Sequence, residues 1–170
     1  MAITYTDTSD STQPLESRYN TLAQERELYL ERARDCSELT IPTLIPQDGY
    51  TGAEEFETTY QGIGARGVNN LASKLLLSLL PPNAPFFRLA IDNFAVREIE
   101  EDENLRTQID SGLVKIEKAV MDDIEMSNDR VAVFEALKHL VVAGNCLLFV
   151  GKEGLRVFPL SQYVLERDPM

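Results

Sequence analysis

A glycine pattern found in dinucleotide-binding proteins stands at residues 62–67, where the chain reads Gly-Ile-Gly-Ala-Arg-Gly. In those proteins the glycines follow a buried parallel strand and open a helix whose N-terminus holds a pyrophosphate. Here the preceding residues, 54–60, are too polar for such a strand, and no strand–helix–strand pattern follows. A structural role is favoured, in which small residues let another backbone approach the helix start. A nucleotide-binding enzyme using Gly62, Gly64 and Gly67 is a weaker alternative.

The other residues that could carry out chemistry are not arranged as a site. Glu54, Glu55 and Glu57 have no neighbouring histidine or partner carboxylate, so a solvated loop explains them better. The acidic run at 100–103 lacks the alternating ligands and central glycine of a calcium loop. His139 is the only histidine, and no nucleophile–base pair is built on it. The sequence thus predicts no catalytic, cofactor-binding or metal-binding residue, and a protein that is not an enzyme.

The glycines open the segment around which the chain is organised, residues 61–82. It lies in a stretch without Asp or Glu, residues 61–91, in a protein of 170 residues whose formal net charge is −12. Apolar residues at three- and four-residue spacing predict a helix, which two prolines end. Its buried face would consist of Val68, Leu71, Ala72, Leu75, Leu76, Leu79 and Leu80. Leu77 widens this face, so we expect cover on more than one side. The open flank would carry Arg66, Asn69, Asn70 and Lys74.

A second long helix is predicted before this segment. Residues 1–11 are rich in Thr, Ser and Asp and are expected to form a mobile arm. The helix should follow, capped by Thr12 with Pro14 in its first turn, and run to about residue 37. Its seam at seven-residue spacing would consist of Leu15, Leu22, Tyr29 and Cys36, with Tyr19, Arg26 and Ala33 interleaved. We expect this helix to pack on its own domain.

The segments between and after these helices are shorter or more polar. Prolines predict an extended segment at 39–46, and a polar loop follows at 47–58. A short strand is expected at 86–91. Apolar periodicity predicts two further helices, near 105–124 and 130–143.

The last part of the chain predicts β-structure. Gly144 closes the preceding helix, and two apolar runs, 146–150 and 155–158, flank a glycine-bounded turn, which indicates a hairpin. Another strand is expected at 163–166. The predicted fold class is therefore α+β and mainly helical, with long helices packed against short β-strands and a hairpin.

Composition excludes several classes of protein. The net negative charge argues against a surface that grips a phosphate backbone as a whole. The N-terminus lacks the basic start and apolar core of a signal peptide, and no apolar run approaches the about 20 residues that cross a membrane. Cys36 and Cys146 lie among apolar neighbours, so buried free thiols in a reducing compartment are expected rather than a disulfide.

Several stretches together resemble the portal, or head-to-tail connector, proteins of short-tailed phages. The likeness spans most of residues 15–168, in the right order. It rests on Thr40-Ile41-Pro42 with Leu44 and Pro46, on Gly64-Ala65-Arg66-Gly67 followed by Asn69 to Leu75, on Phe134 to Lys138 with Leu140 to Asn145, and on Ser161 with Tyr163, Val164, Arg167 and Asp168.

The resemblance implies a subunit of a twelve-membered ring at the unique vertex of an icosahedral capsid. Residues 12–170 would form most of its wing region and stop before the stem, clip and crown. Such rings serve head assembly, DNA packaging and genome ejection, and they join head to tail. The implied partners are the major capsid protein and scaffold, the terminase motor, a tail adaptor protein, and double-stranded DNA that passes without sequence-specific binding. The implied location is the virion, after assembly in the host bacterial cytoplasm, with no cofactor and no membrane.

Within this resemblance, one set of residues is expected to make contacts inside the wing or between subunits. It consists of Gly64, Arg66, Gly67, Asn69, Asn70 and Lys74. The alternative is a helical scaffold or interaction module without a channel role, which would behave as a monomer or small oligomer. The strand pattern at 163–166 ends without a cap or tail, which favours an N-terminal portion of a longer protein.

Overall fold

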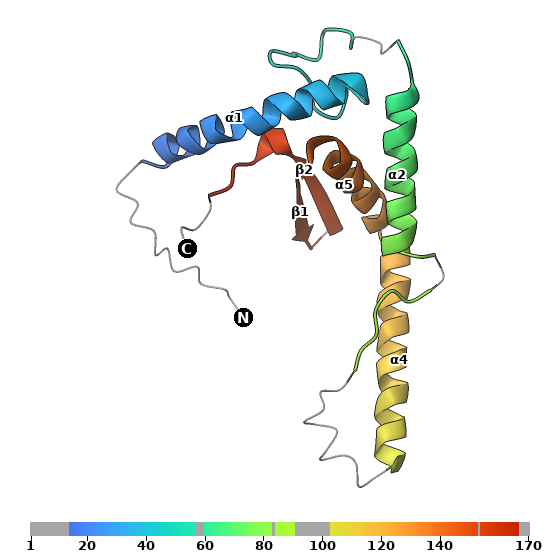
Figure 1. The fold of residues 1–170 in the computed structure, drawn as a ribbon. Coiled ribbons are helices and arrows are strands. Elements are labelled where there is room, and N and C mark those ends of the chain that lie inside the picture. The colour runs from blue at the N-terminus through green and yellow to red at the C-terminus, as the bar shows by residue number, and fades with distance from the viewer. Residues whose placement is uncertain (1–13, 57–59, 83, 91–102, 153, 167–170) are drawn as a thin grey trace.

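The computed structural model describes residues 14–56, 60–82, 84–90, 103–152 and 154–166 (Figure 1). Within these residues the regular structure is four α-helices, one β-hairpin and a short 3-10 helix, which confirms the predicted mainly helical α+β class. The elements are α1 (Leu15–Leu39), α2 (Ile63–Leu79), α4 (Glu103–Met126), α5 (Asp129–Ala143), β1 (Cys146–Gly151), β2 (Gly154–Pro159) and η1 (Leu160–Gln162). None of the described helices is long and apolar enough to cross a membrane.

Helix α5 is the element on which the others pack. It contacts α1, α2, α4 and both strands, and Figure 1 shows it enclosed between α1, α2 and the hairpin. Its buried residues are Ala136, Leu137, His139 and Val142. The helix ends as predicted at Gly144, whose φ of 75° is left-handed and whose N–H donates to the Leu140 carbonyl at 2.9 Å.

The predicted central helix is present as α2, but it is covered on one side only. Val68 and Ala72 are buried against α5, whereas Leu71 and Leu77 are exposed. The expectation that Leu77 widens the buried face is wrong for this structure, because its side chain is 55% exposed. The helix stops at Leu79, before the two prolines, in agreement with the prediction.

One glycine of the pattern at 62–67 lies against another backbone. A Cβ atom on Gly64 would lie 2.6 Å from the carbonyl oxygen of Leu39 and 3.1 Å from Cγ2 of Thr40, so the end of α1 packs directly on the start of α2. A Cβ on Gly62 or Gly67 would meet nothing within 4 Å. The expected close approach therefore occurs at Gly64 alone.

Helix α1 is long and packs within the domain, but its buried seam differs from the predicted one. Leu30, Ala33 and Ser37 are buried, whereas the predicted seam residues Tyr29 and Cys36 are exposed. Ala33 is buried as predicted, but the seven-residue spacing of the other seam positions did not show which of their neighbours face the core. Leu15 and Tyr19 are exposed as well. Pro14 directly precedes the helix, and Thr12 lies outside the described residues.

The segment after α1 forms a turn instead of the predicted extended run at 39–46. The Leu44 N–H donates to the Ile41 carbonyl at 3.0 Å. The fully buried Ser37 holds this turn, because its hydroxyl donates to the Ile41 carbonyl at 2.8 Å and accepts from the Ile45 N–H at 3.1 Å. Ile45 is thereby placed in a core cluster with Leu30, Ala33 and Leu160.

The predicted hairpin is confirmed. β1 and β2 pair antiparallel, with Leu147 opposite Phe158 and Gly151 opposite Gly154. Its turn is fixed to the first turn of α5, because the Asp129 carboxylate accepts a hydrogen bond from the Leu155 N–H at 3.0 Å.

Two other predicted strands are absent. Residues 86–90 form no strand and instead run beside α4, where the Leu89 N–H donates to Oε1 of Glu117 at 2.6 Å. Residues 163–166 form no strand either, because that segment crosses α1 instead of pairing with the hairpin. Helix α4 extends away from the packed part of the chain (Figure 1), and its predicted apolar positions Ile116 and Val120 remain exposed.

The contact at Gly64 predicts opposite effects for two glycine substitutions in one helix. Gly64→Ala should lower the free energy of unfolding by about 1–3 kcal/mol, because the new methyl group meets backbone that cannot move aside cheaply. Gly67→Ala should raise it by about 0.5–1 kcal/mol, because the added methyl meets no atom and alanine favours a helix. Urea denaturation of both variants measures these changes. Equal stability of the two variants would contradict the close packing.

Candidate interaction surface

The outer face of α2 carries a group of exposed polar side chains. Arg66, Asn70 and Lys74 follow one another at four-residue spacing, so they share one face of the helix, and all three are exposed. This face is turned away from the buried residues Val68 and Ala72 that contact α5. The structure therefore brings together three of the predicted residues on the predicted open flank.

The other predicted residues are divided between this face and the interior. Asn69 and Gly67 are also exposed, to either side of the row formed by Arg66 and Asn70, and the Asn69 carbonyl accepts a hydrogen bond from the Ser73 hydroxyl at 2.7 Å. Gly64 is on the opposite side, against the end of α1. Its role is thus in packing between helices of this chain, whereas the remaining residues are open to a partner.

The charge on this face is not neutralised within the described structure. Helix α2 contains no acidic residue, and the side chains of Arg66 and Lys74 form no hydrogen bond or ion pair with the rest of the described chain. Arg34 behaves differently, since it forms ion pairs with Glu27 and Asp48. Two cations on one exposed helix face are therefore available to acceptors or carboxylates outside this chain.

Two apolar residues extend this surface. Ile63 and Leu77 are 75% and 55% exposed. Leu77 stands seven residues after Asn70 and eleven after Arg66, so it lies in the same row along α2. We call Ile63, Arg66, Asn70, Lys74 and Leu77 the outer face of α2. The contribution of Leu77 was missed because the residue was assigned to the core, and its spacing alone does not show how many sides of the helix are covered. A face that combines apolar and cationic groups is typical of a protein contact.

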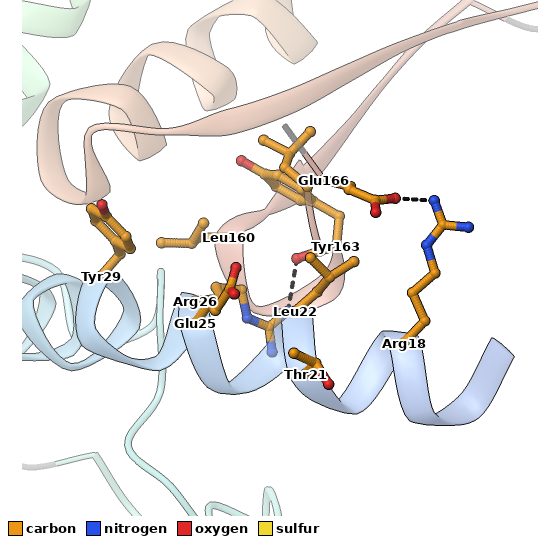
Figure 2. A pocket seen from close by; sticks show the side chains of 10 residues that line it. Arg18, Thr21, Leu22, Glu25, Arg26, Tyr29, Leu160, Tyr163 and Glu166 are labelled. Carbon is orange, nitrogen blue, oxygen red and sulfur yellow. Dashed lines mark hydrogen bonds and ion pairs between the residues drawn. The ribbon is translucent and has the colours of Figure 1, made fainter. Parts of the chain in front are cut away.

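A hollow lies between α1 and the segment after β2, with a volume of about 760 Å³. Figure 2 shows Arg26 reaching from α1 to this segment, where its Nη1 donates to the carbonyls of Tyr163 at 2.7 Å and Ser161 at 3.1 Å. Arg18 forms an ion pair with Glu166 at one end of the hollow. From the sequence, Arg26 was predicted only as an interleaved residue of the α1 seam, because no sequence signal shows which carbonyls it meets.

The hydrogen bonds and the ion pair across the hollow attach the segment after β2 to α1. The side chains that line the hollow are not arranged for catalysis. Burial raises the pKa of the Tyr163 hydroxyl, Cys146 raises it further, and the Arg26 charge acts in the opposite direction. A phenol with a raised pKa stays protonated at neutral pH, so little phenolate is present to act as a base. Within the described ranges, no three His, Cys, Asp or Glu side chains are grouped so that they could hold a metal ion.

The glycine pattern at 62–67 lacks the setting of a nucleotide site. Residues 60–62 contain no strand, and the helix begins at Ile63 directly after a loop. A pyrophosphate site of the dinucleotide type needs the strand as well as the glycines. This geometry gives no support to the nucleotide-binding alternative.

His139 is buried in the interior of the domain. Its side chain is 4% exposed, and Nδ1 has no hydrogen-bond partner in the described structure. Burial lowers the pKa of His139, nearby Glu135 raises it in part, and Lys138 lowers it. The residue therefore resists protonation in the folded chain.

The two cysteines are free thiols in different surroundings. Cys146 is partly buried, its Sγ lies 3.5 Å from the Ala136 carbonyl, and burial raises its pKa. Cys36 is exposed on α1, so the expectation that both thiols are buried is wrong for Cys36, because the core faces the other side of that helix.

Comparison with known proteins finds one family over nearly the whole chain. The sequence model of the family described as "Bacteriophage head to tail connecting protein" matches residues 12–170. The chain is 40% identical over 158 residues to the portal protein of Escherichia phage T7, which covers 89% of this chain and 29% of that protein. It is 38% identical over 155 residues to the portal protein of Enterobacteria phage T3, with 88% and 29% covered. Against the portal protein of Pseudomonas phage phiKMV it is 30% identical over 142 residues, with 81% and 28% covered.

The match to the family model includes every described element and every residue of the outer face of α2. The chain spans less than a third of the length of these curated relatives.

The environment of His139 predicts a loss of stability in acid. The unfolded chain takes up a proton at about pH 6.5, whereas the folded chain does so only at lower pH. As pH falls below 6.5, the free energy of unfolding should therefore fall, by up to about 1.4 kcal/mol per pH unit from this group. His139→Leu should remove this pH-dependent fall in the free energy of unfolding. Chemical denaturation between pH 4.5 and 7.5 measures both slopes, and identical slopes would contradict the assignment.

Proposed function

Because this chain belongs to the family of bacteriophage head-to-tail connecting proteins, we propose that it is the N-terminal part of a portal subunit. Twelve such subunits form a ring at the unique vertex of the capsid. The observation that carries this proposal is the match over residues 12–170, which includes the core and all packed elements together. The family likeness is thus a property of the whole fold and does not rest on one motif.

The ring serves head assembly, DNA packaging and genome ejection, and it joins the head to the tail. Its partners are the major capsid protein and scaffold, the terminase motor, a tail adaptor protein and the double-stranded DNA in the channel. It works in the virion after assembly in the host bacterial cytoplasm. A net charge of −12 supports a channel subunit that does not hold DNA tightly, since tight binding depends on Lys and Arg that neutralise phosphates.

The subunit acts as a structural part and not as an enzyme. The described side chains form no metal site, and the glycine pattern has no strand before it. The energy for DNA movement then comes from the separate packaging motor. Residues 12–170 make up most of the wing region, and the remaining regions belong to chain that follows residue 170.

The outer face of α2 makes contacts between subunits or between parts of the wing. A closed ring of identical subunits requires each copy to present a face that fits a different face of its neighbour. The unpaired cations Arg66 and Lys74, together with exposed Leu77, suit such a contact.

The ring is tested by mass photometry of the purified full-length protein. Particles of about twelve subunit masses, with a central hole in negative-stain images, are expected because closed heterologous contacts generate rings. A monomer or small oligomer at micromolar concentration would favour the alternative, a helical scaffold or interaction module without a channel role.

The proposed contact through the outer face of α2 is tested by Arg66→Ala combined with Lys74→Ala. Ring yield in the full-length protein should fall at least about tenfold, because a contact loss of about 1.4 kcal/mol per subunit changes the association constant tenfold. The melting temperature of the monomer should change by less than about 2 °C, since both residues are exposed.

A matched control removes the same charge elsewhere. Lys115 and Lys118 are exposed on α4, and Lys115→Ala with Lys118→Ala should leave ring yield unchanged if the effect is specific to α2. Normal ring formation by the variant with Arg66→Ala and Lys74→Ala would rule out this contact, but it would not contradict the proposal that the subunits form a ring.

A further inference from the structure

Strand β1 is apolar on both of its faces, and side chains on both faces remain exposed. Successive side chains of a strand point to opposite sides, so Leu147 and Phe149 lie on one face and Leu148 and Val150 on the other. They are exposed by 40%, 55%, 42% and 78% respectively. A strand with one solvated face usually alternates apolar and polar residues, whereas a continuous apolar run is typical of a strand buried on both faces.

The outer edge of β1 is also open. The sheet in the described part of the chain has two strands, so β1 pairs with β2 on one side only. Strand edges exposed to solvent are usually protected by a charge, a proline or a bulge. Residues 146–150 contain no charged residue and no proline, and the pairing from Cys146 to Gly151 is regular.

The hairpin is covered unevenly by α5. The β2 residues Leu155, Val157 and Phe158 are partly buried, whereas residues 147–150 of β1 are all exposed. Helix α5 contacts β2 more extensively than β1. A two-stranded hairpin is at best marginally stable in water without further cover. The strand farther from the helix is therefore the one that lacks a neighbour.

We propose that β1 is an inner strand of a larger sheet in the complete subunit, and that its missing neighbour is a strand from the same polypeptide downstream of residue 170. This rests on the proposed function, in which the subunit continues beyond that residue. The matched part is 29% of the phage T7 and T3 relatives, so more than two thirds of those proteins is chain that this structure does not contain.

A strand from the same polypeptide fits the open edge of β1 better than a strand from a second copy. A strand that depended on a second copy for its neighbour would leave every monomer with an open apolar edge, which promotes aggregation.

Residue-resolved hydrogen exchange on the full-length protein tests this inference. Alternate amides of residues 147–150 point away from β2, so a free edge gives fast and slow amides in alternation. In the monomer, at a dilution confirmed by mass photometry, we expect all four amides to exchange at least about a hundredfold more slowly than in an unstructured peptide. An alternating pattern in both monomer and ring would overturn the proposal. Slow exchange that appears only in the ring would assign the neighbour to a second copy and would overturn it equally.

A substitution gives an independent readout. Val150→Lys should lower the melting temperature of the full-length monomer by at least about 4 °C, because a charge would enter a covered apolar layer. Tyr60→Lys is the control, since Tyr60 is fully exposed in a loop, and it should cause no shift. An unchanged melting temperature for Val150→Lys would show that Val150 remains in solvent. The expected result of each measurement is observed on the monomer, so a failure of ring formation would count against the proposed function without deciding this inference.

Discussion

The burial of one helix, α5, is the constraint on which the rest of the fold depends. Apolar residues occur around most of its circumference, and a helix of that kind must be covered from several sides. α1, α2 and the hairpin provide that cover, and each packs on α5 with one face while its other face stays open. The exposed surfaces of α2 and β1 follow from this arrangement, because the described chain has one shared core and few elements to cover the outer sides.

Local sequence patterns were sufficient to predict the helices and strands whose bounds are marked by residues within them or next to them. The bounds of α2 and α5 follow from apolar periodicity and from the proline and glycine residues that end them. The hairpin follows from two apolar runs around Gly151 and Gly154. Each of these signals lies within a few residues of the feature that it predicts, so no knowledge of the tertiary fold is needed.

Features that depend on a distant partner were not predictable in the same way. The α1 seam was predicted correctly at Ala33 but not at Leu30, because the residues that cover this part of the helix, Ile45 and Leu160, come from later segments. The turn after α1 depends on two hydrogen bonds of the Ser37 hydroxyl, and a serine can equally well lie exposed on a helix. In the candidate surface, Arg66, Asn70 and Lys74 were identified as an open flank, whereas the apolar contribution of Leu77 required knowing that only one side of α2 is covered.

The contact made by Arg26 has a consequence for how this chain can vary. Its guanidinium binds the carbonyl oxygens of residues 161 and 163, which are backbone atoms that every amino acid supplies. These two hydrogen bonds can therefore persist when the side chains at 161 and 163 change, whereas they are lost when Arg26 is replaced by a residue without a donor. Substitutions that keep this junction should thus be restricted at position 26 by the hydrogen bonds, and in the segment after β2 mainly by the burial of Leu160 in the core cluster.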